Sequence, residues 1–171
     1  FSDPSKTWIG QNIKYDLLIL KNHGFDLVGN IFDTMLAHYV INADGKHGMD
    51  ALSEQYLNYK PVSIEALIGP KGKNQNSMAH LPAESIKDYA AEDADVTLQL
   101  AEIFMPELET QGTTSVLQNI EIPLVGVLAN MEWEGIRVDK DFLNAYSVEL
   151  GKELDIIEEK ITERAGEKFN L

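Results

Sequence analysis

The stretch DYAAEDADVTLQLAEIF, residues 88–104, constrains the fold most strongly. Alanine, leucine and straight-chain residues dominate it, Gly and Pro are absent, and apolar residues recur with the period of an α-helix. At about 100° per residue, one side of this helix collects Ile86, Tyr89, Val96, Thr97, Leu100 and Phe104. Asp93 falls in the middle of that side, whereas Asp88, Glu92, Asp95 and Gln99 lie on a flank that water can solvate. The sequence therefore predicts a long helix with one carboxylate on its apolar side.

Asp93 needs a compensating partner, because burying an unpaired carboxylate costs several kcal/mol. A basic side chain, a hydrogen-bonding cluster and a metal ion are the three candidates. Asp16 has a similar setting beside the apolar stripe of its own short helix. Two such acids suit Mg²⁺, which takes one or two carboxylates and keeps its other positions for water and phosphate, and Tyr89 is placed to orient a metal-bound water. The pattern alone leaves open a structural ion pair for Asp93, a first-turn acid for Asp16 and a core tyrosine for Tyr89.

The charge of the chain argues against a basic nucleic-acid-binding surface of its own. Among 171 residues, 28 are acidic and 14 are basic, giving a formal net charge of -14. Either the chain avoids nucleic acid, or it meets nucleic acid through metal ions and through basic surface supplied from elsewhere. There are no cysteines, which excludes disulfides and fits a cytoplasmic setting. No apolar run approaches the ~20 residues that span a bilayer, so no membrane association is expected.

The first part of the chain reads as mixed α/β. KTWIGQN and FDLVGNIFD are candidate strands, and between them IKYDLLILKNHG is a candidate helix with Asn12 as its N-cap and Gly24 as its stop. TMLAHYVIN follows as a helix capped by Asp33. Next comes a short helix in MDALSEQYL, which Asp50 is expected to cap. The histidines, at positions 23, 38, 47 and 80, have no ligand spacing and are assigned to no metal.

The remainder of the chain reads as helical. A single helical turn is expected over 64–68, and Pro82 is expected to open the long helix, which should run to about Leu108 with a kink at Pro106. ETQGTTS is a composition break where we place a domain boundary. After it, VLQNIEIPLVGVLANMEWEG predicts a helix kinked at Pro123 and stopped at Gly135. A short extended piece, IRVD, then leads to a second long helix over 141–165.

Four segments resemble the bacterial family A DNA polymerases over the whole chain length: GQNIKYDLLIL, FDTMLAHYVIN, YAAEDADVTLQL and NIEIPLVGVLANMEWEGIRVD. KYD and Y-x-x-x-D resemble the second and third motifs of the DEDDy exonucleases. The resemblance implies that residues 1–111 form the later part of a 3′-5′ proofreading exonuclease domain with a helix-rich α/β, ribonuclease H-like fold that lacks its first strands. Residues 112–171 would be the first, all-helical part of a polymerase domain, at the base of the thumb.

The resemblance also implies roles for individual residues. Asp93 matches a ligand of the first of two divalent cations, Mg²⁺ or Mn²⁺, and Asp16 matches an aspartate that helps to hold the second. Tyr89 matches the tyrosine that orients the attacking water. Asn12 and Tyr15 match positions that touch the 3′ end of a single DNA strand or frayed primer. The expected reaction is two-metal-ion hydrolysis of the 3′-terminal phosphodiester.

Two departures from the family limit this expectation. The family's first motif, Asp-x-Glu, should lie upstream of Phe1, so the chain by itself is expected to bind Mg²⁺ poorly and to be inactive. A chain that begins at FSDPSKTW without Met and ends at GEKFNL without a helix stop also reads as a piece of a longer protein, whose nucleotide-binding motifs would follow Leu171. Ile64 stands where some relatives present an aromatic residue to a base.

Three other interpretations remain open at this stage. A family A polymerase domain that keeps the fold without activity would be a structural connector; the retained Asp16, Tyr89 and Asp93 argue against it. A DEDDy exoribonuclease would share both motifs but not the polymerase-like segment 119–139. An acidic interaction module that binds through the helix over 141–165 is less favoured than a solvated helix face.

Overall fold

The computed structural model describes residues 1–167 and divides the chain into two compact units, Phe1–Glu134 and Gly135–Leu171. The expected absence of a helix stop at GEKFNL is wrong, because Gly166 ends the last helix in a left-handed conformation with φ 75°; residues 168–171 lie outside the described part. The domain boundary expected at 111/112 stays a prediction.

Two short strands form a parallel pair at the start of the first unit. Strand β1 (Thr7–Gly10) pairs with β2 (Asn30–Asp33), with Thr7 opposite Asn30 and Gly10 opposite Asp33. Helix α1 (Ile13–Asn22) connects them, and Gly24 adopts φ 77° just after it, as expected for its stop. Both strands and the connecting helix lie where the sequence predicted them, and together they form a βαβ unit.

Asp33 ties the starts of two helices together. Its carboxylate accepts hydrogen bonds from the backbone N–H groups of Met35 (2.9 Å) and Leu36 (3.2 Å), which confirms it as the cap of α2 (Thr34–Ile41). The same carboxylate accepts from the N–H groups of Ile13 (2.8 Å) and Asn12 (3.2 Å). Asn12 does occupy the N-cap position of α1, in a left-handed conformation, but its side chain makes no capping bond. Asp33, from a distant part of the sequence, supplies the acceptor instead.

The middle of the first unit consists of short helical pieces. Helix α3 (Met49–Leu52) continues into the π-helical turn η1 (Ser53–Leu57); α4 (Ile64–Ile68) and the 3-10 turn η2 (Met78–His80) follow. The expected cap Asp50 is wrong, because the N-cap residue is Gly48 and no side-chain capping bond is made there. Asp50 lies within the first turn, where a carboxylate still complements the helix dipole.

Helix α5 (Ala83–Gln111) carries most of the core. Its buried face includes Val96, Leu100, Phe104 and Leu108, which pack with Ala37 of α2, Leu52 of α3 and Leu117. The predicted apolar stripe is therefore confirmed over its second half. The helix runs one turn beyond the expected end at Leu108, continues through Pro106 and stops at Gly112, whose φ of 70° favours glycine.

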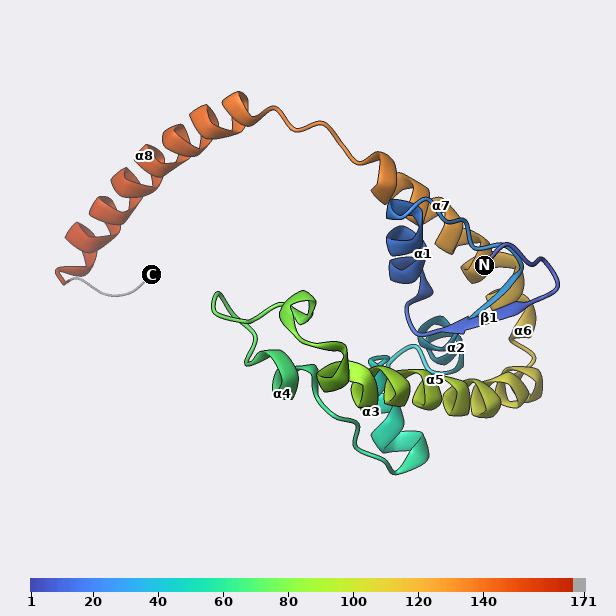
Figure 1. Cartoon of the computed structure of the whole chain (residues 1–171). Coiled ribbons are helices and arrows are strands. Elements are labelled where there is room, and N and C mark those ends of the chain that lie inside the picture. Colours follow the sequence, from blue (N-terminus) through green and yellow to red (C-terminus); the bar gives the residue numbers. More distant parts are fainter. Residues whose placement is uncertain (168–171) are drawn as a thin grey trace. The chain divides into compact units, whose positions relative to one another are not determined.

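A broken helix completes the first unit. Helix α6 (Thr114–Val116) passes through the π-helical turn η3 (Leu117–Glu121) into α7 (Ile122–Glu134). The widened turn immediately precedes Pro123, which has no N–H to donate, so the expected disturbance takes the form of a π-helical turn. Within this unit, α7 lies beside α1 on one side of the strand pair, and α5 packs against β1 on the other (Figure 1).

The second unit is dominated by α8 (Lys140–Ala165). Asp139 caps this helix by accepting a hydrogen bond from the N–H of Phe142 at 2.9 Å. Residues 135–139 belong to no helix or strand. Among residues 1–167, no helix is both long and apolar enough to cross a bilayer.

Candidate functional site

Asp16 and Asp93 line the same cavity, although they lie in different helices. The cavity has a volume of about 720 Å³ and is walled by β1, by α1 with Asp16, and by α5 with Asp93 and Thr97. The two helices meet here because α1 follows β1 after a two-residue connection and α5 packs against β1. The structure therefore brings the two predicted metal-ligating residues to one site.

Asp93 is half-buried and incompletely satisfied. Its Oδ1 atom is buried and has no hydrogen-bond partner among the described residues. Burial raises the pKa of the Asp93 carboxyl group above its ordinary value; the Tyr89 hydroxyl opposes this, and the charges of Glu92 and Asp50 add to it. An ionised carboxylate in this position lacks a compensating cation, which is the situation that a bound metal ion corrects.

Asp16 is exposed to the cavity and carries no ion pair with the described residues. Partial enclosure raises the pKa of its carboxyl group; its own backbone N–H opposes the shift, and the negative charge of Asp33 adds to it. Asp16 is thus a second acid whose charge the described protein groups do not compensate.

Tyr89 interacts with Asp93 one turn further along α5. Burial, followed by the charge of Asp93 and a hydrogen bond to it, raises the pKa of the Tyr89 hydroxyl to about 12. Tyr89 therefore remains protonated at neutral pH and acts as a hydrogen-bond donor, not as a base. The side chain does not line the cavity itself.

Asn12 and Tyr15 are not brought into the cavity between the two aspartates. Tyr15 is 62% exposed on α1. Asn12 lines a separate small cavity of about 90 Å³, together with Lys14, Asp33 and residues of α7. Their proximity to a DNA strand stays a prediction.

The described residues offer a partial ligand set for a metal ion. Within residues 1–167, no group of three or more His, Asp or Glu side chains is gathered closely enough to hold a metal. The orphaned Oδ1 of Asp93 and the nearby carboxylate of Asp16 nevertheless supply the hard oxygen ligands that Mg²⁺ and Mn²⁺ prefer.

Gln11 is a cavity residue that sequence reasoning missed. Its Nε2 donates to the carbonyl oxygen of His47 at 2.7 Å, and its Oε1 accepts from the hydroxyl of Thr34. Gln11 therefore links the end of β1 to the loop before α3. The sequence signal that could have identified Gln11 is its position in GQN, directly after a predicted strand.

Glu92 was also missed, since it was expected to be solvated. Its carboxylate instead accepts hydrogen bonds from the hydroxyl of Tyr59 and from the N–H of Val62, the latter at 2.7 Å. Glu92 thereby fastens the segment after η1 to the turn of α5 that carries Asp93.

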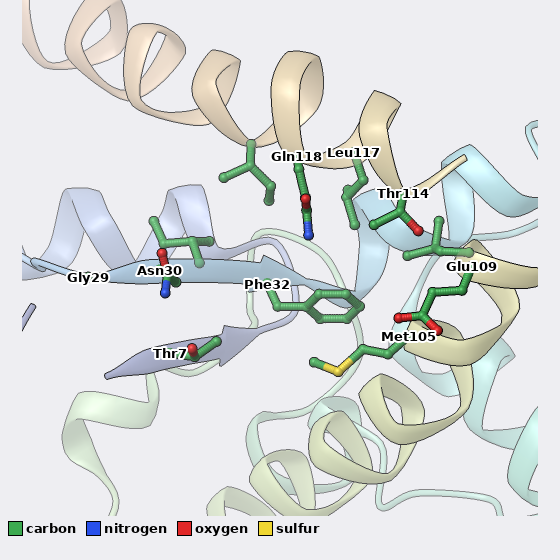
Figure 2. Close-up of a pocket in the computed structure, with 12 residues that line it drawn as sticks. Thr7, Gly29, Asn30, Phe32, Met105, Glu109, Thr114, Leu117 and Gln118 are labelled. Atoms are coloured by element: carbon green, nitrogen blue, oxygen red, sulfur yellow. The ribbon is translucent and has the colours of Figure 1, made fainter. Parts of the chain in front are cut away.

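A second cavity, of about 600 Å³, contains none of the predicted site residues. It lies between β2 and the segment from α5 to η3. Figure 2 shows the side chains of Phe32 and Met105 pointing toward one another across it, with Gln118 and Glu109 at its border.

Comparison with protein families shows the class to which the chain belongs. The DNA polymerase A model for 3′-5′ exonucleases matches residues 1–109. The chain therefore belongs to the 3′-5′ exonuclease family of the DNA polymerase A type.

Relatives named DNA polymerase I match almost the whole chain. The protein from Rhizobium leguminosarum is 42% identical over 170 residues, covering 99% of this chain and 16% of the relative. The protein from Pseudomonas aeruginosa is 39% identical over 173 residues, covering 99% and 19%, and that from Borreliella burgdorferi is 42% identical over 163 residues, covering 95% and 18%. The chain thus spans less than a fifth of the length of these relatives.

A solved structure supports the fold. The POL domain of Pol1 from M. smegmatis, in complex with DNA primer-template and dNTP, matches with a TM-score of 0.73 and 22% identity, covering 99% of this chain and 26% of that one. The expected fold class, a helix-rich α/β exonuclease fold of ribonuclease H type with a small sheet followed by helices, is confirmed.

Proposed function

We propose that this chain is part of a DNA polymerase I in which the Asp16–Asp93 cavity belongs to a 3′-5′ proofreading exonuclease site. The observation that carries this proposal is the orphaned, buried Oδ1 of Asp93 in a cavity that Asp16 also lines. Family membership supports the reaction class. The proposal extends to the expected domains, 1–111 for the exonuclease part and 112–171 for the start of the polymerase part.

In this proposal Asp93 and Asp16 hold divalent cations, and Tyr89 orients the attacking water. The cations, when bound, supply a nucleophile at neutral pH and stabilise the charge that develops on the phosphodiester. Tyr89 keeps its proton, so its hydroxyl donates a hydrogen bond and positions either Asp93 or a water beside it. On the side of β1 and α5 the cavity wall includes apolar residues, Ile9, Ala94 and Leu98. Asn12 and Tyr15, near the start of α1 and outside the lining of the cavity, contact the 3′-terminal nucleotides in this proposal.

The proposal is tested with a protein that extends this chain upstream through the strand expected to carry Asp-x-Glu. Labelled single-stranded DNA should be shortened from its 3′ end only with Mg²⁺ or Mn²⁺ present. The change Asp93→Ala should abolish shortening, whereas Asp95→Ala, at an exposed neighbouring position of α5, should not. A folded extended protein that shortens no DNA would refute the proposal and leave a structural domain.

A further inference from the structure

Helix α1 presents two opposite faces, and each has a different partner. Asp16 faces the cavity. Lys14 and Lys21 are separated by two helical turns and share the face that packs on α7. Along the helix axis, Lys14 therefore contacts α7 before Asp16, and Lys21 contacts α7 after it.

The two lysines make specific contacts with the end of α7. The ammonium group of Lys14 forms an ion pair with Glu132. Lys21 donates a hydrogen bond to Oδ1 of Asn130 at 2.9 Å, and its Nζ lies 5.0 Å from the centre of the Trp133 ring, a cation–π distance. The described residues make two ion pairs, and of these only Lys14–Glu132 joins separate helices.

Besides its packing on α7, helix α1 is fixed at its start. Asp33 holds the N–H groups of Asn12 and Ile13, and Ile13 is the single buried residue of the helix. The rest of this ten-residue helix packs on α7. The contacts of Lys14 and Lys21 add specific polar interactions on that face, which restrict a tilt of α1 about its start.

We propose that Glu132, Asn130 and Trp133 of α7 are positioning residues for Asp16. They act through Lys14 and Lys21, and they fix the orientation of α1 so that the Asp16 carboxylate stays directed at the cavity shared with Asp93. This inference rests on the proposed function, because it assigns the three residues to a metal site. All three lie beyond residues 1–109, which the exonuclease family model matches.

The ion pair suits a positioning role better than a stabilising one. The side chains of Lys14 and Glu132 are 29% and 49% exposed, and ion pairs so accessible to water contribute little to global stability. Their removal should therefore alter the geometry of α1 without unfolding the unit. This separation makes the inference testable.

The test uses the protein extended upstream through the strand expected to carry Asp-x-Glu, because the 171-residue chain by itself is expected to bind the metal poorly. Mn²⁺ is the probe, and DNA is absent. Nuclear magnetic resonance would measure residual dipolar couplings of the α1 amides, which report the orientation of the helix, and the Mn²⁺ concentration that half-broadens the signals of Asp16 and Asp93. In Glu132→Gln we expect changed couplings in α1 and an apparent Mn²⁺ dissociation constant at least about 3-fold higher, less than the ~10–100-fold effect of groups that touch a metal ligand directly.

Two further variants separate positioning from nonspecific damage. The reversed pair Lys14→Glu/Glu132→Lys should restore both readouts towards wild type. Glu134→Gln, on the same helix, removes a carboxylate that makes no ion pair within residues 1–167 and should leave both readouts unchanged.

Unchanged couplings in Glu132→Gln, or changed couplings with unchanged Mn²⁺ affinity, would overturn the positioning role. If the wild-type extended protein shows no broadening centred on Asp16 and Asp93 at any Mn²⁺ concentration, the metal site and the inference built on it both fail. That result differs from a failure of the variant alone, in which wild-type broadening is present.

Discussion

The Nδ1 atoms of His38 and His47 lie 2.7 Å apart in the first unit. Only one hydrogen fits between them, so one ring donates while the other accepts. His38 is fully buried, and its Nε2 lies 3.1 Å from the Tyr56 hydroxyl. This cluster joins α2 to the loop before α3 and to η1, and it borders Phe104 of the core.

We expect the free energy of unfolding to decrease as the pH falls below about 6.5. Burial, with a contribution from the neighbouring His47, lowers the pKa of His38 from its ordinary value of 6.5. The unfolded chain therefore binds more protons than the folded chain below pH 6.5, and stability is lost as the pH falls from 6.5 towards the lower folded-state pKa of His38. Urea denaturation from pH 8 to pH 5, followed by tryptophan fluorescence, measures this slope. The change His38→Asn should flatten it, whereas the same change at the exposed His80 should not.

Gly45 is required for the histidine contact. A Cβ atom at position 45 would lie 2.7 Å from Cε1 of His38 and 3.2 Å from Nδ2 of Asn42. The change Gly45→Ala should therefore destabilise the chain by about 1–3 kcal/mol, as overpacking does elsewhere. Gly48→Ala is the matched control, because a Cβ atom there meets nothing within 4 Å. Equal stability of the two variants would contradict the described packing around His38.

Neutralising Asp93 should stabilise the isolated chain. The raised pKa shows that the folded state disfavours the ionised carboxylate. Because the side chain is only half-buried, we expect Asp93→Asn to increase the unfolding free energy by a modest amount, about 0.5–1 kcal/mol at pH 7 without metal. Asp95→Asn, at an exposed position, should have no such effect. A loss of stability in Asp93→Asn would show that the carboxylate already has a partner in the protein.

Asp33→Ala should destabilise the first unit by about 2–4 kcal/mol, because it removes one cap and leaves further helix N–H groups unsatisfied. Both tryptophans, Trp8 and Trp133, lie in the first unit and report its unfolding. Asp139→Ala removes a single capping bond from α8 in the second unit and should leave the tryptophan transition unchanged. A similar shift in both variants would show that Asp33 does not serve α1 and α2 together.

Local signals in the sequence were sufficient for most elements. Hydrophobic period, caps and stop residues placed both strands, α1, α2 and α5 correctly, because each signal acts within a few residues of the backbone it controls. The errors also have local causes. Asp50 resembles a cap in sequence, but the N-cap of α3 lies two residues earlier, at Gly48.

The site depended on information that periodicity does not contain. Periodicity singled out Asp16 and Asp93 and suggested a shared Mg²⁺ site. The family resemblance added their roles as ligands of one two-metal centre, which the separation of their helices in sequence does not reveal. The bonds that Glu92 makes to Tyr59 and Val62, and the pairing of His38 with His47, are likewise tertiary contacts between elements. No pattern within one helix predicts them.

The burial of Leu117 has a practical consequence for where the chain can be shortened. Leu117 is 1% exposed and packs with Phe104 and Leu108 in the core, yet it follows the last residue matched by the exonuclease family model. A protein ended at residue 109 would leave the core surface of α5 open to water and would lack α7 altogether. The compact unit is therefore longer than the segment that the family model matches. A protein shortened after Glu134 keeps this unit whole.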